Sequence, residues 1–250
     1  MGSNASSLPE LLKLLRIKLP ESAAAILHDY QHRKVICGQN LYRAGEAFEN
    51  LYFVFSGTLK LVHGNVEGYE CVIEFPMKSD LVGTDGICEQ HYQMDAVALT
   101  DVDVVVMPFR SLVALSRDIP AIEDFLYSSI SRSMVREQTS KSLLAHLTAE
   151  ARVARFLLML SERFEALGFS SNSYLLKMTR QDIGSYLGLT IETVSRSFTA
   201  LANTGLIDVA QRAIKLNDKT ALRTLQRLQT TSPRPSALQT SQLSLHHIVG

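Results

Sequence analysis

The stretch TRQDIGSYLGLTIETVSRSF, Thr179–Phe198, predicts two short amphipathic helices separated by a tight turn. The turn falls at Gly188–Thr190, where glycine can adopt a left-handed backbone that ends the first helix. Thr179 and Asp182 have the spacing of a capping box at the start of that helix. Thr190 is the matching cap of the second helix. Together these signals predict a helix-turn-helix.

The second helix predicts one buried and one exposed face. The apolar side chains expected to be buried are Ile191, Val194, Phe198 and Leu201. Glu192 and Arg196 lie four residues apart, so they share a face, and Ser195 adjoins them. A guanidinium can donate to guanine O6 and N7, and a carboxylate can accept from cytosine N4. The sequence therefore predicts that Glu192, Ser195 and Arg196 contact DNA bases. The alternative is a surface salt bridge, worth about 0.2–0.5 kcal/mol.

The starts of the two helices are predicted to meet the DNA backbone. Exposed N–H groups and the helix dipole make a helix N-terminus a favourable place for phosphate. The expected backbone contacts are Thr179, Arg180, Gln181, Thr190 and Thr193. The chain as a whole has no net charge, but residues 177–230 carry eight Lys/Arg against four Asp/Glu. This local excess favours double-stranded DNA as the partner.

The surrounding sequence predicts a winged helix-turn-helix domain over residues 148–228. A helix is expected over 151–167, and two short apolar runs, 206–209 and 213–216, predict a hairpin or wing after the recognition helix. A last helix is expected over 218–228. The tail, residues 229–250, is rich in Ser, Thr, Gln and Pro, and is predicted to be disordered.

The N-terminal part predicts a different architecture. Residues 1–20 are expected to form a helical arm that ends at Pro20. Residues 21–118 contain short apolar, β-branched or aromatic runs broken by Gly, Asn and Asp, a rhythm typical of an antiparallel barrel or jelly roll. The predicted fold class is therefore α+β.

Residues 119–147 predict one long helix between the two domains. Its apolar positions recur mostly every four residues, a seam suited to a partner helix, and they are Ile122, Leu126, Ile130, Met134 and Val135. Such a helix is either a dimer coiled coil or a spacer between domains. Two operator half-sites require two recognition helices, which favours a homodimer.

The remaining composition excludes other classes. No apolar run approaches the roughly 20 residues of a membrane span, and the N-terminus lacks a signal-peptide pattern, so a cytoplasmic location without membrane contact is expected. Cys37, Cys71 and Cys88 are odd in number and widely spaced, which argues against disulfides. Buried, unreactive packing is expected for Cys71 and Cys88. No nucleophile–base set, phosphate loop or metal-ligand spacing is present, so neither an enzyme nor a metal site is expected.

At this point the chain resembles the Crp/Fnr family of bacterial transcription regulators, and its FNR branch in particular. The resemblance covers about residues 19–228 and is carried by MTRQDIGSYLGLTIETVSR (Met178–Arg196), by Lys34–Leu61 and by Ser79–Ile87. It implies a cyclic-nucleotide-binding-like β-roll, a dimerisation helix and a C-terminal winged helix-turn-helix.

The resemblance also implies a target and partners. For FNR-like proteins, side chains at the places of Glu192, Ser195 and Arg196 imply a TTGAT–ATCAA palindrome. Activation of anaerobic, redox-responsive or nitrogen-oxide-responsive genes is implied. RNA polymerase is an expected partner, at the loops 65–69 and 78–85.

The sensor signatures of that family do not carry over. A [4Fe–4S] cluster needs four thiolates, whereas no cysteine precedes Cys37 and Val105 stands where the β-roll cysteine would be. Met94 and Asp95 occupy the place of the Arg-Ser pair that binds cyclic AMP. Neither cofactor is therefore expected. Two alternatives remain open, namely regulation by protein abundance alone, and haem or redox sensing through the cysteines or one of His28, His32, His63 and His91.

Overall fold

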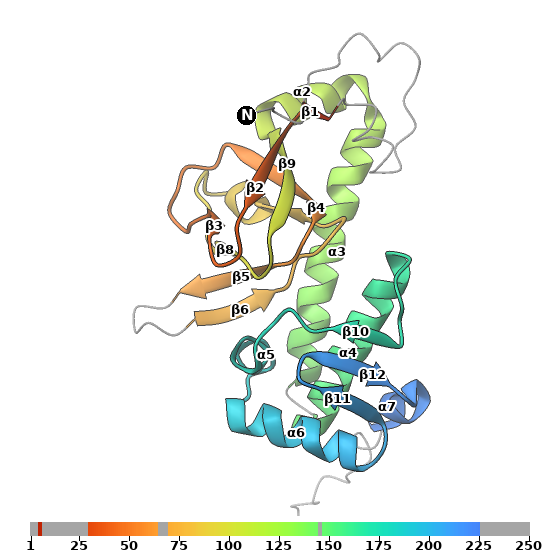
Figure 1. The fold of residues 1–250 in the computed structure, drawn as a ribbon. Helices are drawn as coiled ribbons and strands as arrows, with labels where there is room; N and C mark the ends of the chain where they lie inside the picture. Colours follow the sequence, from red (N-terminus) through yellow and green to blue (C-terminus); the bar gives the residue numbers. More distant parts are fainter. Residues whose placement is uncertain (1–4, 7–29, 65–69, 145–146, 226–250) are drawn as a thin grey trace, which may run out of the picture.

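The computed structural model describes residues 5–6, 30–64, 70–144 and 147–225. Nine strands precede the long helix in this part of the chain: β1 (Ala5–Ser6), β2 (Tyr30–Val35), β3 (Asn40–Tyr42), β4 (Asn50–Ser56), β5 (Leu59–Gly64), β6 (Glu70–Glu74), β7 (Leu81–Val82), β8 (Asp95–Ala98) and β9 (Val102–Pro108). They form two antiparallel sheets of order β1-β2-β9-β4-β7 and β3-β8-β5-β6. The predicted jelly roll is confirmed (Figure 1).

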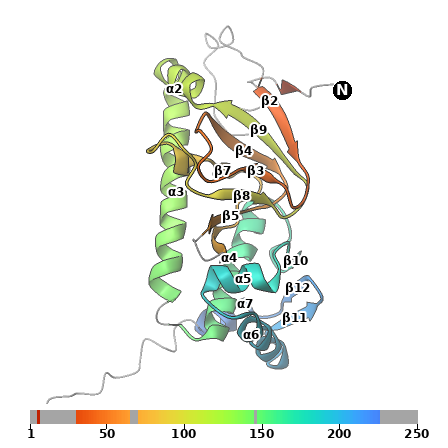
Figure 2. The same ribbon diagram turned by 90° about the vertical axis from the view of Figure 1, so that its left-hand side faces the viewer.

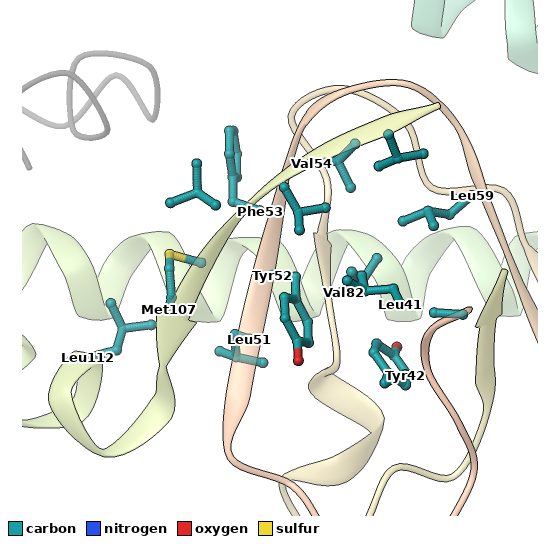
Figure 3. Packing of buried hydrophobic residues seen from close by; sticks show 14 of the residues in the cluster. Leu41, Tyr42, Leu51, Tyr52, Phe53, Val54, Leu59, Val82, Met107 and Leu112 are labelled. Atoms are coloured by element: carbon teal, nitrogen blue, oxygen red, sulfur yellow. The ribbon is translucent and has the colours of Figure 1, made fainter. Parts of the chain in front are cut away.

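The core of the β-roll includes side chains from both faces of its central strands, because one face meets the opposite sheet and the other meets α3. Strand side chains alternate between faces, and β4 and β9 are the central pair. Leu51, Phe53 and Val54 from β4 and Met107 from β9 are almost completely buried there. Figure 3 shows these side chains around β4 and β9, with the long helix behind the strands. Val105, at the place of the family's β-roll cysteine, is also buried in this core.

Two helices follow the β-roll: α2 (Phe109–Asp118) and α3 (Pro120–Leu144). Figure 2 shows α3 running along one side of the roll down to the C-terminal domain. Ile122 and Leu126 belong to the core cluster of the roll. The single seam predicted for a partner helix is therefore wrong at these two positions. One side of α3 covers the roll, whereas Met134 and Val135 are exposed.

The C-terminal unit comprises α4 (Ala149–Ala166), β10 (Ser173–Leu175), α5 (Arg180–Leu187), α6 (Ile191–Asn203), β11 (Ile207–Ala210), β12 (Ala213–Leu216) and α7 (Lys219–Leu225). The predicted wing is the hairpin β11–β12. The structure adds β10, which pairs with β12 to make a three-stranded sheet. This is the winged helix-turn-helix that the sequence predicted.

Two predictions lie mostly or wholly outside the described residues. The predicted N-terminal helix over residues 1–20 is described only at Ala5–Ser6, which form β1 and pair with β2. The tail over residues 229–250 is not described at all.

The β-roll and the C-terminal unit share a second apolar cluster. Val72 and Phe75, near the end of the roll, pack in one buried cluster with Phe156 of α4 and Ile183 of α5. The ring of Phe75 lies 6.0 Å from that of Phe156 and 5.3 Å from that of Tyr186. The helix-turn-helix is thus packed against the β-roll rather than tethered to it by a linker.

Candidate nucleic-acid interface

The first helix of the motif begins with the predicted capping box. The Thr179 hydroxyl accepts from the Asp182 N–H at 3.1 Å, and the Asp182 carboxylate accepts from the Thr179 N–H at 2.9 Å. Ile183 and Leu187 face inward and are buried. The helix ends at Gly188, whose φ of 63° is the left-handed conformation expected there.

The turn between the helices is unusually close-packed at Gly184. A β-carbon at this position would lie 2.6 Å from the carbonyl oxygen of Leu189, which is far inside van der Waals contact. From α4, Arg152 donates to the Leu187 carbonyl at 3.1 Å and to the Leu147 carbonyl at 3.2 Å. These contacts fix the angle between α5 and α6. Sequence analysis did not find them, because they depend on an approach of two backbones and on a partner from another helix.

The second helix begins with the predicted cap and buries most of the predicted side chains. The Thr190 hydroxyl accepts from the Thr193 N–H at 3.2 Å. Val194, Phe198 and Leu201 are buried. Ile191 is 45% exposed, so its prediction as a buried residue is wrong. Ile191 is the first residue of α6 and has no preceding turn of its own helix to pack against.

The three predicted base-contacting residues lie on the exposed face of α6. Glu192, Ser195 and Arg196 are all exposed. Within the described residues, Arg196 has no hydrogen bond or ion pair, and none joins it to Glu192. The Glu192 carboxylate is held at the helix start. A hydrogen bond to its own backbone N–H, then one to Thr190, and the charge of Arg196 lower its pKa. The carboxylate is therefore an ionised acceptor near a guanidinium that donates to no other described residue.

The predicted backbone contacts have different surroundings. Thr179, Gln181 and Thr190 are exposed at the helix starts, and Thr193 is half-buried. Arg180 differs from a free surface cation, because its guanidinium carbon lies 3.4 Å from the centre of the Phe198 ring. Such a cation–π contact braces α5 against α6. Burial lowers the pKa of Arg180.

Hydrogen bonds and ion pairs join α5 to the edge strand β6 of the roll. Ser185 Oγ accepts from the Val72 N–H at 2.9 Å and donates to the Glu70 carbonyl at 2.7 Å. One hydroxyl thereby satisfies two main-chain groups of an edge strand. Lys60 Nζ lies 2.6 Å from Glu70 Oε2 and 3.1 Å from Asp182 Oδ1. Burial of Lys60 opposes its charge, but the hydrogen bonds to Glu70 and Asp182 outweigh burial and raise its pKa.

A cleft of about 960 Å³ separates the starts of α5 and α6 from the β-roll. Thr179, Gln181 and Glu192 line it on one side, and Cys37 and Lys60 on the other. Thr179, Gln181 and Glu192, which are predicted to contact DNA, therefore border this space.

The candidate sensor residues are placed differently from the prediction. Cys37, Cys71 and Cys88 are all exposed, so the buried packing expected for Cys71 and Cys88 is wrong. Among the histidines, His32 Nδ1 lies 2.8 Å from Asp103 Oδ1. No three His, Cys, Asp or Glu side chains of the described ranges are grouped to hold a metal ion. His28 lies outside those ranges.

Asp80, in the turn after β6, connects the β-roll to both α3 and α4. Arg136 of α3 donates to Asp80 Oδ1 at 3.2 Å, and Arg163 of α4 pairs with Asp80 Oδ2. Arg163 also donates to the Phe75 carbonyl at 2.9 Å. Arg136 Nε lies 2.9 Å from Glu74 Oε1. No sequence spacing indicated this cluster.

Glu74 is the member of this cluster whose charge is opposed by its surroundings. Burial raises the pKa of its carboxyl, although the charge of Arg136 and a hydrogen bond from Ser133 act in the opposite direction. The folded chain therefore binds this proton more tightly than the unfolded chain does. The stability that this group contributes is complete below the ordinary carboxyl pKa of about 4.3. It is lost as the pH rises through the raised pKa.

We accordingly expect Glu74→Gln to have a Tm at pH 7 equal to or above that of the parent chain, because the variant carries no buried charge there. The difference should shrink as the pH is lowered toward that ordinary value, where the parent carboxyl is also neutral. Thermal unfolding of both chains over this pH range checks the prediction. A lower Tm for Glu74→Gln at pH 7 would contradict it, since the pairing with Arg136 would then outweigh burial.

Two family models match the chain over most of its length. Residues 32–118 match the cyclic nucleotide-binding domain, and residues 151–225 match the Crp-like helix-turn-helix domain. In addition, no helix in the described ranges has both the length and the hydropathy needed to cross a bilayer.

Similar proteins are transcription regulators. The chain is 37% identical to the transcriptional activator protein FnrA of Stutzerimonas stutzeri, over 74% of this chain and 76% of that protein. It is 38% identical to the transcriptional activator protein anr of Pseudomonas aeruginosa over the same shares. The solved structure of FixK2 from Bradyrhizobium japonicum superimposes with a TM-score of 0.73 at 26% identity, covering 79% of this chain and 98% of that one. These relatives are regulators and not enzymes.

The cavity next to Met94 is small, and the arginines at its wall are already paired. The cavity between the roll, α3 and α4 measures about 50 Å³, whereas small-molecule sites measure about 300–1,000 Å³. Met94 lines it, and the arginines at its wall, Arg136 and Arg163, are paired with carboxylates. Asp95 accepts from the Ala44 N–H at 2.7 Å and would repel a phosphate.

Proposed function

Since this chain belongs to the Crp/Fnr family of transcription regulators, we propose that it binds a TTGAT–ATCAA-like palindrome as a homodimer and activates transcription in the cytoplasm. The observation that supports this most directly is the exposed face of α6. There Glu192, Ser195 and Arg196 are exposed together, and within the described residues no hydrogen bond or ion pair occupies the Arg196 guanidinium. A gel-shift titration on this palindrome and on a scrambled duplex tests the proposal, and equal affinity for the two would refute it.

The exposed side of α3 supports the homodimer. Tyr127, Met134 and Val135 are 64%, 55% and 58% exposed, although they are large apolar side chains. Ser131 lies between them at helical spacing and is small enough to admit a second helix. In the described residues of α3, the β-roll already covers the opposite side, which leaves this side to a partner.

We expect Met134→Glu to convert the dimer to a monomer at micromolar concentrations. Two carboxylates brought together at an apolar helix contact would be desolvated and would repel each other. Sedimentation velocity measures the mass. Ser111→Glu, at an exposed polar position of α2 and outside this face of α3, is the control and should leave the mass unchanged. If Met134→Glu still has the mass of a dimer, the dimer contact does not lie on this face of α3.

Ile191 adds an apolar contact that sequence analysis missed. It lies at the start of α6 and shares a face with Ser195, four residues later. The operator half-site TTGAT contains three thymines, and a branched aliphatic side chain can pack against a thymine methyl.

We expect Ile191→Ala to weaken operator binding about fourfold per half-site, since a buried methylene is worth about 0.8 kcal/mol. The loss should disappear on duplexes in which uracil replaces thymine, because uracil lacks the methyl. Equal losses on thymine and uracil duplexes would show that Ile191 acts through the fold instead. Fluorescence anisotropy on the two duplexes makes the measurement.

The genes under control are proposed from the relatives. Three are named transcriptional activators, and others are named anaerobic regulatory protein and fumarate and nitrate reduction regulatory protein. We propose the same theme, anaerobic, redox or nitrogen-oxide metabolism, for this chain. RNA polymerase is the proposed partner of an activator. Of the two loops expected to contact it, 78–85 is described and 65–69 lies outside the described residues.

A second candidate is a regulator that needs no small-molecule effector and is controlled by its abundance. The cavity of about 50 Å³ favours it. Operator affinity measured with and without haem, nitric oxide or a reductant distinguishes the two. An ultraviolet–visible spectrum of protein purified without oxygen tests for haem and iron–sulfur groups directly. Unchanged affinity and a featureless spectrum support control by abundance, whereas a chromophore supports a sensor.

A further inference from the structure

Asp80 lies where three parts of the molecule meet. Its carboxylate accepts from the Met77 N–H at 2.8 Å, which fixes the turn after β6. It also accepts from Arg136 of α3 at 3.2 Å and from Arg163 of α4. The carboxylate is largely buried, so solvent screens these contacts little. Asp80 is thus a direct polar link between the long helix and the first helix of the DNA-binding domain.

The link to α4 is also a link to the recognition helix. Arg152 of α4 donates to the Leu187 carbonyl at the end of α5, and α4 packs against α6 in one buried cluster. Whatever holds α4 relative to α3 therefore holds α6 as well. In a dimer joined through α3, that relation sets the distance between the two recognition helices, which must match the distance between half-sites on DNA.

A bound ligand is one way to hold such a junction, but here the junction is filled by the chain's own side chains. Arg136 and Arg163 line the cavity of about 50 Å³ beside Asp80. Their guanidiniums bring rigid, directional donors to the carboxylate, and Arg163 reaches the Phe75 carbonyl too.

We propose that Asp80 is a positioning residue for DNA recognition, which through Arg136 and Arg163 fixes the separation of the two recognition helices without an effector. This inference rests on the proposed function, because it concerns binding to a palindrome. The proposed role of Asp80 differs from a purely structural role in one respect. Loss of the link should relax the preference for half-site spacing and leave the preference for half-site sequence intact.

The test compares operators whose central spacer is lengthened or shortened by one or two base pairs. Asp80→Asn keeps an acceptor for the Met77 N–H and removes the charge, and Arg163→Met removes the opposite partner. The control is Glu162→Gln. Glu162 is next to Arg163 on α4, but it forms an exposed ion pair with Arg223 within the DNA-binding domain. We expect the parent chain and Glu162→Gln to prefer one spacing at least tenfold, and both junction variants to prefer it less than threefold.

A second measurement needs no DNA. In a chain with its three exposed cysteines replaced by serine, spin labels at Ser128→Cys on α3 and Glu165→Cys on α4 report the distance between the helices, with excess unlabelled chain present. We expect a narrow distance distribution that broadens in Asp80→Asn and Arg163→Met but not in Glu162→Gln.

The outcomes separate the two proposals. A parent chain that does not distinguish the palindrome from a scrambled duplex refutes the proposed function, and the spin-label distances then decide the role of Asp80. Junction variants that keep the parent spacing preference, or that lose affinity equally at every spacing, overturn the role of Asp80 while the proposed function stands. Unbroadened distances in both variants overturn it as well.

Discussion

Arg196→Ala should abolish the preference for the TTGAT–ATCAA palindrome over a scrambled duplex. A bidentate arginine–guanine contact is worth about 1–3 kcal/mol of discrimination. A homodimer makes it twice, so the loss is about 2–6 kcal/mol, or roughly 30-fold to 20,000-fold in relative affinity. The stability of the folded chain should not change, because the Arg196 guanidinium is exposed and has no partner in the described residues. The loss therefore reports DNA recognition alone.

The matched variant is Arg196→Lys. It keeps the charge but not the planar pair of donors, so attraction to phosphate should survive while discrimination falls. Arg223→Ala removes a surface arginine that is paired with Glu162 away from α6, and it should change neither property. Competition titrations with both duplexes at two salt concentrations distinguish these effects. If Arg196→Ala keeps full preference for the palindrome, the face of α6 assigned to DNA is wrong.

Local spacing made the motif predictable. The caps at Thr179 and Thr190, and the stop at Gly188, are set by residues within four positions of one another, so the sequence alone indicates them. Three exposed side chains on one face of α6 follow from the helical period once the start of the helix is known. The short apolar runs and turn residues of the β-roll are likewise set by residues close together in the sequence.

The element that packs on an apolar helix face cannot be predicted from neighbouring residues in the sequence. The apolar period of α3 predicts a packed side but not whether the β-roll or a second chain packs on it, and the roll takes Ile122 and Leu126. Ile191 fits the apolar period of α6 but is its first residue, and 45% of it stays exposed. The pairs at Asp80 join residues 56 and 83 positions apart, and charge pairs at such separations leave no pattern in a sequence.

Gly184→Val should unfold the turn of the helix-turn-helix and abolish operator binding. Replacing glycine inside a helix ordinarily gains up to about 1 kcal/mol. Here even a β-carbon would lie 2.6 Å from the Leu189 carbonyl, and valine adds two methyl groups in a buried position. Overpacking of this kind costs about 1–3 kcal/mol, and the backbone oxygen cannot rotate away as a side chain can.

The control is Gly64→Val, since a β-carbon added there would have no other atom within 4 Å and the φ of Gly64 is ordinary. Valine also suits a strand such as β5. We expect Gly64→Val to have the Tm and the operator affinity of the parent chain. Gly184→Val should have a lower Tm and no operator binding. Contacting groups must be held within about 0.5 Å to act together. Gly184→Val should therefore lose operator binding even at temperatures where the rest of the chain stays folded, and a variant that binds the palindrome normally would show that the turn tolerates the shift.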